Sequence, residues 1–223
     1  MKVIARSNPI RINIASSYEV LAGYVNLDSS PFFRLGRLPN WAKRFIPVKY
    51  RETVQTYYQA DQAASVILHD CRKPLPFEGQ SVQHALCSHF LEHVPRVEAL
   101  GVLHEIFRVL QPGGTLHLIV PDLAYQVGKY QEATNRGDPV ASERFIRGLL
   151  MKSEHPPTLL RRALDLIGSY GLEHWWMYDR ASLKCIVGEA GFSECSGLDF
   201  DSSDYRKDDP ESLHMFCKKP SVA

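Results

Sequence analysis

Short apolar runs alternate along this chain with segments whose apolar residues recur at helical spacing. The expected strands cover residues 11–15, 23–28, 64–70, 81–88 and 115–120, with two more near 195–200 and 213–217. Helical spacing over 96–110 predicts one helix, and a second is expected over 181–190, where Gly191 would end it. Because strands and helices alternate, the pattern predicts an α/β fold with a mostly parallel sheet.

Two stretches depart from this alternation. Residues 29–60 contain six basic residues against one acid, Glu52, together with seven aromatic residues. Residues 123–172 have the spacing of two or three helices, interrupted at Pro156-Pro157. We expect both to be insertions over the carboxyl edge of the sheet, within a single domain spanning 1–223.

Composition narrows the class of protein. The 223 residues are 44% hydrophobic, which suits one globular domain with a buried core. A net charge of +1 gives no general attraction to nucleic acid or to an anionic membrane. The five cysteines form no C-x-x-C pair, which argues against a disulfide framework and a zinc knuckle. The first residues lack a signal-peptide core, and we expect a cytoplasmic protein.

Polar residues stand where several expected strands end. Asp28 ends the second strand, Asp70 ends the third, and Ser88 and His89 close the fourth. In an open α/β sheet, the carboxyl ends of the strands border the crevice in which ligands bind. The sequence therefore predicts a ligand site along this edge.

A series of short motifs then suggests a family. In chain order they are Asn13-Ile14, Gly23-Tyr24-Val25-Asn26-Leu27-Asp28, His69-Asp70-Cys71-Arg72, Ser88-His89-Phe90-Leu91-Glu92-His93, Pro112-Gly113-Gly114, Val120-Pro121-Asp122, His174-Trp175-Trp176-Met177-Tyr178-Asp179 and Glu189-Ala190-Gly191-Phe192. Together they resemble a bacterial, type 11-like branch of the class I S-adenosylmethionine-dependent methyltransferases. The resemblance implies a Rossmann-like sheet of seven strands, mostly parallel with the last antiparallel, helical cap insertions, and S-adenosylmethionine as cofactor.

The resemblance also implies roles for the strand-end residues. Asp28 would accept hydrogen bonds from the ribose hydroxyls of the cofactor, since a carboxylate only accepts. Asp70 would accept from the adenine amino group, with the Cys71 backbone beside it. Ser88 and His89 would lie under the methionine portion. The alternatives are a strand-end acid capping the next turn for Asp28, and an Asx turn for Asp70.

One motif departs from the family. After the positions of Asn13-Ile14, the family has glycine, any residue and glycine, where this chain has Ala15, Ser16 and Ser17. Glycine serves there because the backbone approaches the ligand and can need a positive φ. We still expect Asn13, Ala15, Ser16 and Ser17 to contact the cofactor. A helix N-terminus could bind the cofactor carboxylate here, since Ser16 to Glu19 fits the capping box S-x-x-E and free N–H groups bind carboxylates.

Methyl transfer needs alignment and exclusion of water, and an oxygen acceptor also benefits from a base. His89 and His93, four residues apart, are predicted on one helical face as catalytic residues with Glu92. A buried structural histidine is the alternative for each. The residues expected to contact the substrate are Asp122, His174 and Tyr178.

Two other functions compete with methyl transfer. The run from His89 to His93 matches H-x-x-E-H, the motif of a class of zinc hydrolases, although we expect no metal here. The loss of the glycine loop favours a catalytically inactive, methyltransferase-like binding or scaffold protein.

The expected partner is a small-molecule or saccharide acceptor, methylated at oxygen, and no nucleic acid. The basic and aromatic segment 29–60 suggests an acidic partner or peripheral docking at an anionic membrane, with a solvated charged face as the alternative.

Overall fold

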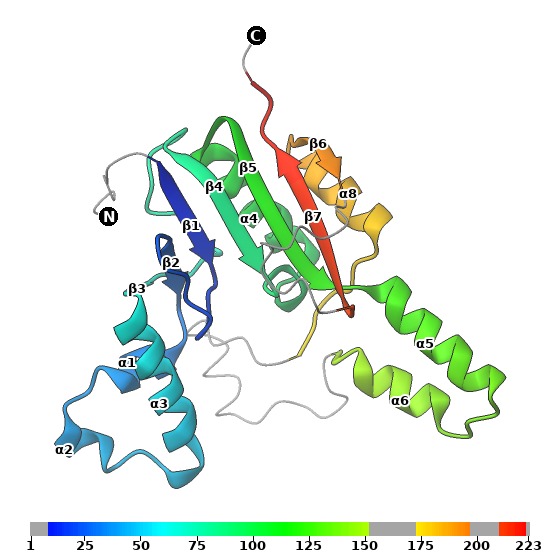
Figure 1. Ribbon diagram of the computed structural model, residues 1–223, viewed down its shortest axis with the longest axis horizontal. Coiled ribbons are helices and arrows are strands. Elements are labelled where there is room, and N and C mark those ends of the chain that lie inside the picture. Colours follow the sequence, from blue (N-terminus) through cyan, green and yellow to red (C-terminus); the bar gives the residue numbers. More distant parts are fainter. Residues whose placement is uncertain (1–8, 152–172, 197–209, 222–223) are drawn as a thin grey trace.

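The computed structural model describes residues 9–151, 173–196 and 210–221 and contains a seven-stranded sheet of order β3-β2-β1-β4-β5-β7-β6 (Figure 1). The strands are β1 Ile10–Ile14, β2 Val25–Asp28, β3 Val66–Leu68, β4 Val82–Ser88, β5 Leu110–Pro121, β6 Ser193–Ser196 and β7 Ser212–Lys218. Strands β1 to β5 pair in parallel, and β7 is antiparallel to both β5 and β6. The predicted α/β sheet with an antiparallel last strand is confirmed.

Helices surround this sheet. They are α1 Pro31–Gly36, α2 Asn40–Lys43, α3 Val48–Ala63, the short 3-10 helix η1 Leu91–His93, α4 Arg96–Val109, α5 Leu123–Asn135, α6 Ala141–Gly148 and α8 Arg180–Glu189. The first three lie in or next to the predicted insertion 29–60, and α5 and α6 lie in the segment 123–172, of which residues 152–172 fall outside the described residues. In Figure 1 both groups project beyond the carboxyl ends of the parallel strands. None of the described helices has the length and apolar character needed to cross a membrane.

The two faces of the sheet differ in chemistry. One face packs against α4 and α8 and carries apolar residues, including Ile12, Ile14, Ala85, Leu116, Leu118 and Met215. Side chains alternate between faces, so their neighbours point the other way. Those neighbours include Arg11, Asn13, His84, His117 and His214. Parallel strands usually carry apolar residues on both faces, so this second face is unusually polar.

A buried histidine pair occupies the polar face. His117 Nε2 lies 3.1 Å from His214 Nδ1, and the His117 ring stacks on Phe216 with 3.8 Å between centroids. Burial lowers the pKa of His117 to about 3, helped by the neighbouring His214 and His84. The His117 imidazole is therefore neutral in the folded protein.

We expect this histidine to make the protein acid-sensitive. The unfolded chain binds a proton near the ordinary pKa of 6.5, whereas the folded chain does not. Stability is therefore full above that pKa and is lost as the pH falls toward 3. Going from about pH 7 to about pH 5 should lower the free energy of unfolding by about 2 kcal/mol for this group.

Urea unfolding at several pH values measures the effect. His117→Leu should reduce the pH dependence above about pH 5, where ordinary carboxylates remain ionised, while the part due to His84, whose pKa burial lowers to about 4, remains. The exposed His104→Asn serves as the control and should leave it unchanged. An unaltered pH dependence in His117→Leu would show that the pair does not cause it.

The connection between β1 and β2 corrects one expectation. Residues 15–24 form turns, so the helix N-terminus expected at Ser16 to Glu19 is wrong. Instead, Ser16 N donates to Leu27 O at 2.9 Å and Glu19 N donates to Ser16 O at 3.0 Å. Ser17 takes φ +48°, a left-handed conformation that a right-handed helix does not allow.

A second difference concerns Gln111 to Gly114. The sequence predicts a strand only from Thr115, whereas β5 begins at Leu110 and includes these residues, opposite a register shift between Val82 and His84 of β4. Gly113 has φ +74°, and a Cβ on Gly114 would lie 2.8 Å from Gln111 O. The backbone therefore requires both glycines.

Candidate active site

The strand register brings the predicted strand-end residues to one edge. Ile14 pairs with Leu27 on one side and with Cys87 on the other, and Ser88 pairs with Ile119. The residues that follow the paired Ile14, Leu27 and Cys87 therefore stand in a row: Ala15 just after β1, Asp28 at the end of β2 and Ser88 at the end of β4. This edge is where an open α/β sheet holds its ligand.

The loop after β1 takes the conformation of a glycine loop without its glycines. Ala15 has φ +52° and Ser17 has φ +48°, and these are the two positions at which the family carries glycine. A left-handed conformation costs a non-glycine residue about 1 kcal/mol. Ser17 N donates to Asp28 Oδ2 at 2.8 Å, and Ser17 Oγ lies 2.8 Å from Tyr57 Oη of α3. These two hydrogen bonds of Ser17 offset the conformational free energy that its left-handed backbone costs.

Asn13 stabilises the conformation of this loop through its side chain. Its side chain is buried, and its Nδ2 donates to Glu19 O and to Asn26 Oδ1, both at 3.0 Å. Asn26 Oδ1 also accepts from Leu21 N at 2.9 Å. Asn13 thus fixes the path of the loop through hydrogen bonds within the protein.

Asp28 is held at this edge by two backbone amides. Its side chain accepts from Ser30 N at 2.6 Å and from Ser17 N at 2.8 Å, one bond on each oxygen. Burial raises the pKa of Asp28, and the two amide hydrogen bonds oppose this. Each carboxylate oxygen accepts up to two hydrogen bonds, so one position on each remains for a ligand.

Tyr57 beside Asp28 was missed by the sequence reasoning. It comes from α3 and lies in edge contact with Tyr18 and Phe33. Burial raises the pKa of its hydroxyl, so Tyr57 is neutral near Asp28. The aromatic content of 29–60 was the only signal for it.

Asp70 and Cys71 follow β3. Arg72 donates from Nε to Asp70 Oδ1 and from Nη2 to Asp70 Oδ2, both at 2.9 Å, and Arg72 N donates to Asp70 Oδ1 at 3.2 Å. Burial acts to raise the pKa of Asp70, but Arg72 outweighs it and the pKa is lowered. The local turn is the Asx turn weighed from the sequence. Cys71 is buried, which raises the pKa of its thiol and keeps it protonated.

Two buried polar atoms of this edge have no hydrogen-bond partner among the described residues. They are Ser88 Oγ, at the end of β4, and His69 Nε2, after β3. Buried polar atoms in proteins are nearly always paired, so an orphaned atom at a ligand edge is typical of a group that binds something.

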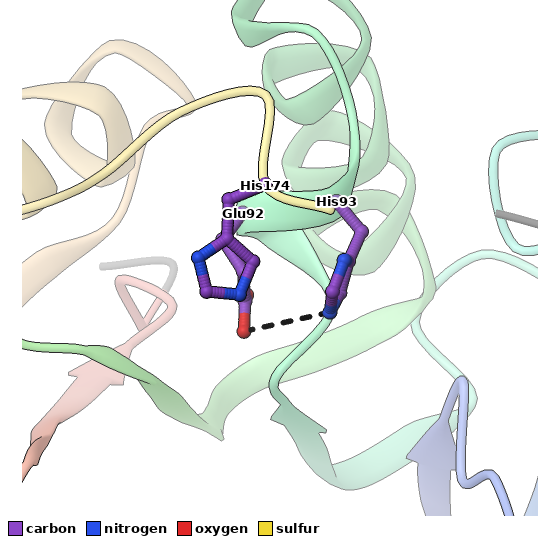
Figure 2. A group of neighbouring side chains, drawn as sticks. All are labelled: Glu92, His93 and His174. Atoms are coloured by element: carbon purple, nitrogen blue, oxygen red, sulfur yellow. Dashed lines mark ion pairs between the residues drawn. The ribbon is translucent and has the colours of Figure 1, made fainter. Parts of the chain in front are cut away.

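A second group of side chains is centred on Glu92, which is fully buried (Figure 2). His89 Nδ1 lies 3.1 Å from Glu92 Oε1, and His93 Nε2 lies 3.9 Å from the same oxygen. The rings of His93 and His174 are 5.0 Å apart. Figure 2 shows Glu92, His93 and His174 converging on one point. Glu92 Oε2 has no partner among the described residues.

Backbone hydrogen bonds assemble this group from distant segments. Trp175 N and Trp176 N donate to Glu92 O at 2.7 and 3.3 Å, which holds the segment before α8 against η1. His174 Nδ1 lies 2.8 Å from Leu149 O, and His93 Nδ1 lies 3.1 Å from Glu173 O. Since a carbonyl only accepts, both Nδ1 atoms carry the proton and both Nε2 atoms present a lone pair. Burial lowers the pKa of His174, which keeps it neutral.

The predicted common helical face of His89 and His93 is wrong. η1 is one 3-10 turn over 91–93, and His89 precedes it with φ +49°. The two histidines nevertheless meet at Glu92 because the chain reverses there. The helix on which H-x-x-E-H would place two zinc ligands is therefore not formed.

Three other side chains, Tyr178, Ser212 and Asp122, differ in how they relate to this group. Tyr178 is buried, its hydroxyl has no partner among the described residues, and burial with the nearby Glu92 raises its pKa to about 12. Ser212 Oγ, which no sequence pattern indicated, lies 3.2 Å from His89 Nε2. Asp122 differs: its carboxylate caps α5 by accepting from Ala124 N at 2.9 Å.

A separate cavity of about 370 Å³ opens at the amino ends of the strands. It is lined by Arg11, Tyr24, Gln83, His84, Gln111, Gly113 and Thr115. It lies at the edge of the sheet opposite to the predicted site, and none of the residues predicted for the site lines it.

The chain is similar to known proteins in part of its sequence and in its fold. Residues 40–118 match a protein family described as "Methyltransferase domain". No curated protein matches the chain in sequence.

Solved structures match over most of the chain. A protein from Methanosarcina mazei, titled as a SAM-dependent methyltransferase, has 14% identity and a TM-score of 0.54, covering 98% of this chain and 95% of its own. One from Thermotoga maritima, titled as a SAM-dependent methyltransferase and possible histamine N-methyltransferase, has 13% identity and a TM-score of 0.52, with coverages of 96% and 83%.

A third match is a chain in a complex of the Haloferax volcanii Trm112 methyltransferase activator and a putative methyltransferase, at 14% identity and a TM-score of 0.51, with coverages of 99% and 86%. Sequence identities this low show a similarity of fold alone. The family match adds a similarity in sequence over residues 40–118. In its fold the chain is similar to solved S-adenosylmethionine-dependent methyltransferases, and residues 40–118 also match the family described as "Methyltransferase domain".

Proposed function

We propose that the protein transfers a methyl group from S-adenosylmethionine to a hydroxyl oxygen of a small-molecule or saccharide acceptor. The observation that carries the proposal is the meeting of two groups at one sheet edge. The loop of Ala15 to Ser17 with Asp28 forms a cofactor cradle, and Glu92 with its histidines forms a proton-accepting group.

The residues present fit the cofactor. Asp28 keeps a lone pair on each oxygen for the two ribose hydroxyls, and Asp70 can accept from the adenine amino group. Ser88 Oγ, which has no hydrogen-bond partner in the part of the chain that the structure describes, offers its hydroxyl to the amino acid portion. When bound, the cofactor supplies an electrophilic methyl group on a sulfonium.

His93 is suited to take the proton of the acceptor. Its Nδ1–H is held by Glu173 O, so Nε2 is free to accept. The Glu92 carboxylate, 3.9 Å away, stabilises the imidazolium that forms. His89 is bound on both nitrogens, to Glu92 and Ser212, and positions the carboxylate.

The second candidate, an inactive scaffold, draws on a specific contact. Tyr57 covers Ser17 and lies near Asp28, where the cofactor would enter. Glu92 argues against this candidate, since its buried carboxylate has one oxygen with no partner among the residues described, and such a group destabilises a fold that has no chemical use for it.

The test of the proposal is transfer itself. The protein is incubated with S-adenosylmethionine carrying an isotope-labelled methyl group and a panel of saccharides, phenols and amines, and products are identified by mass spectrometry. Label on a hydroxyl oxygen supports the proposal, whereas label only on amines would replace the oxygen assignment. His93→Gln should reduce turnover more than cofactor affinity.

We further propose that the segment around α2 docks on an anionic membrane surface. Trp41, Phe45 and Val48 are 67%, 70% and 77% exposed, and Figure 1 places α2 far from the sheet. Lys43, Arg44 and Lys49 are interspersed among them. Apolar side chains flanked by basic ones are typical of segments that lie in the headgroup region.

Vesicle co-sedimentation measures this docking. Replacing Trp41 and Phe45 together by serine should weaken binding to phosphatidylserine-containing vesicles by at least about 10-fold, because apolar burial is lost. Trp176→Ser, at a residue of 43% exposure elsewhere, is the matched control. Equal binding of both variants, or equal binding to neutral phosphatidylcholine, would contradict the proposal.

A further inference from the structure

We propose that Glu92, His93 and His174 bind a divalent first-row transition metal ion, which holds the acceptor hydroxyl. The inference rests on the proposed function for its role, but not for the binding of the metal. One ligand atom from each residue lies within 4.8 Å of the others. The sequence led us to expect no metal, because the run from His89 to His93 lies where a methyltransferase has the end of its fourth strand and the flanking motifs favour that context.

The two imidazoles are already oriented as metal ligands. Both Nδ1–H groups are held by backbone carbonyls, His93 by Glu173 O and His174 by Leu149 O. Metal-binding histidines almost always donate their other N–H to such a carbonyl or to a carboxylate, which fixes the ring and the tautomer. The two Nε2 lone pairs therefore face the common point seen in Figure 2.

Glu92 supplies the charge that such a site needs. It is fully buried, and although Oε1 is bonded to His89, Oε2 has no partner among the described residues. A buried carboxylate is costly unless a cation or donors satisfy it. A metal ion bound by Oε2 and the two Nε2 atoms would satisfy it, with His89 as the outer hydrogen-bond partner of the carboxylate.

The set of donors selects the class of metal. Two imidazole nitrogens and one carboxylate suit Zn²⁺, Co²⁺, Fe²⁺ or Mn²⁺ better than Ca²⁺ or Mg²⁺, which prefer oxygen ligands. Metal–ligand bonds of about 2.0–2.2 Å require the ligand atoms to be closer than they now are. The side chain of His93 is 19% exposed, so it can rotate to bring its Nε2 closer to the other two ligand atoms.

Three protein ligands leave coordination positions open for the acceptor. A bound metal lowers the pKa of a coordinated hydroxyl, so that its proton can pass to water. His93 then acts as a ligand instead of the base. Acceptors that present two neighbouring oxygens, as the diols of saccharides do, would chelate the ion and bind best.

The experiment uses the full chain after treatment with EDTA and removal of the chelator. Co²⁺ is titrated while its visible absorption is recorded, and Zn²⁺ binding is measured by calorimetry. We expect about one equivalent to bind. His93→Gln and His174→Gln should each weaken binding by about 10- to 100-fold. His84→Gln, at a histidine near the opposite edge of the sheet, is the matched control and should bind as the unaltered protein does.

Circular dichroism and S-adenosylmethionine calorimetry on the same samples separate the outcomes. His174 is buried and its variant can fail to fold, whereas the partly exposed His93 keeps the test valid. No Co²⁺ or Zn²⁺ binding, or equal binding by the folded His93→Gln variant, would overturn the metal site. Cofactor binding without metal binding would leave the proposed function standing, and metal binding without cofactor binding would leave only the metal site.

Discussion

Asp28→Asn should weaken the binding of S-adenosylmethionine by about 100-fold, because hydrogen bonds to a charged acceptor contribute about 1.5–3 kcal/mol. The carboxylate holds Ser17 N and Ser30 N and keeps a lone pair on each oxygen for the ribose. Asparagine has the same size but one carbonyl oxygen, so its NH₂ group would face one of the two amide donors. Calorimetry on the purified variant measures the change in affinity.

Asp61→Asn is the matched control for this prediction. Asp61 accepts from Arg37 at 2.7 Å and from Val66 N at 3.0 Å, so the change removes one charge from a bound carboxylate away from the loop. Its cofactor affinity should stay within about threefold of the unaltered protein, less than 1 kcal/mol. If the two variants lost the same affinity, Asp28 would have no special role in the site.

Glu92→Gln should reduce turnover by about 10²–10⁴-fold once an acceptor is known, while cofactor affinity changes little. The substitution keeps the shape of the side chain and removes the negative charge beside His93 and His89. A protonated His93, or a metal ion bound beside it, would then lack the negative charge that balances it. Steady-state kinetics and cofactor calorimetry separate the two effects.

Glu105→Gln provides the control on α4. Glu105 accepts from Arg108 and from Leu75 N, so the change also removes a partly buried, hydrogen-bonded carboxylate. It should leave turnover within about threefold of the unaltered protein. A loss of cofactor affinity in Glu92→Gln as large as the loss of turnover would instead make Glu92 a binding residue.

The sequence predicted the sheet because its strands and helices differ in apolar spacing over many residues. The strand ends at Asp28 and Ser88 were correct, as each lies where a buried run stops. The loop after β1 was harder. The capping-box residues indicated a helix, but the amide of Ser17 binds Asp28, and this long-range contact outweighs a local preference.

The candidate site shows the same limit. His89, Glu92 and His93 are neighbours in the chain, so their proximity could be predicted, but not the geometry, since a 3-10 turn replaced the expected helix. Tyr57 and Ser212 reach Ser17 and His89 from 40 and 123 residues away, and no local pattern encodes such contacts. The position of His174 against Glu92 depends on backbone hydrogen bonds of the two tryptophans that follow it.

Isothermal calorimetry of the EDTA-treated full chain with S-adenosylmethionine and S-adenosylhomocysteine tests the central claim most directly. Binding of both with micromolar dissociation constants, about −8 kcal/mol, is the predicted result, because the loop keeps the left-handed conformation at Ala15 and Ser17. Absence of binding to either compound, in protein shown by circular dichroism to be folded, would contradict it and favour the scaffold.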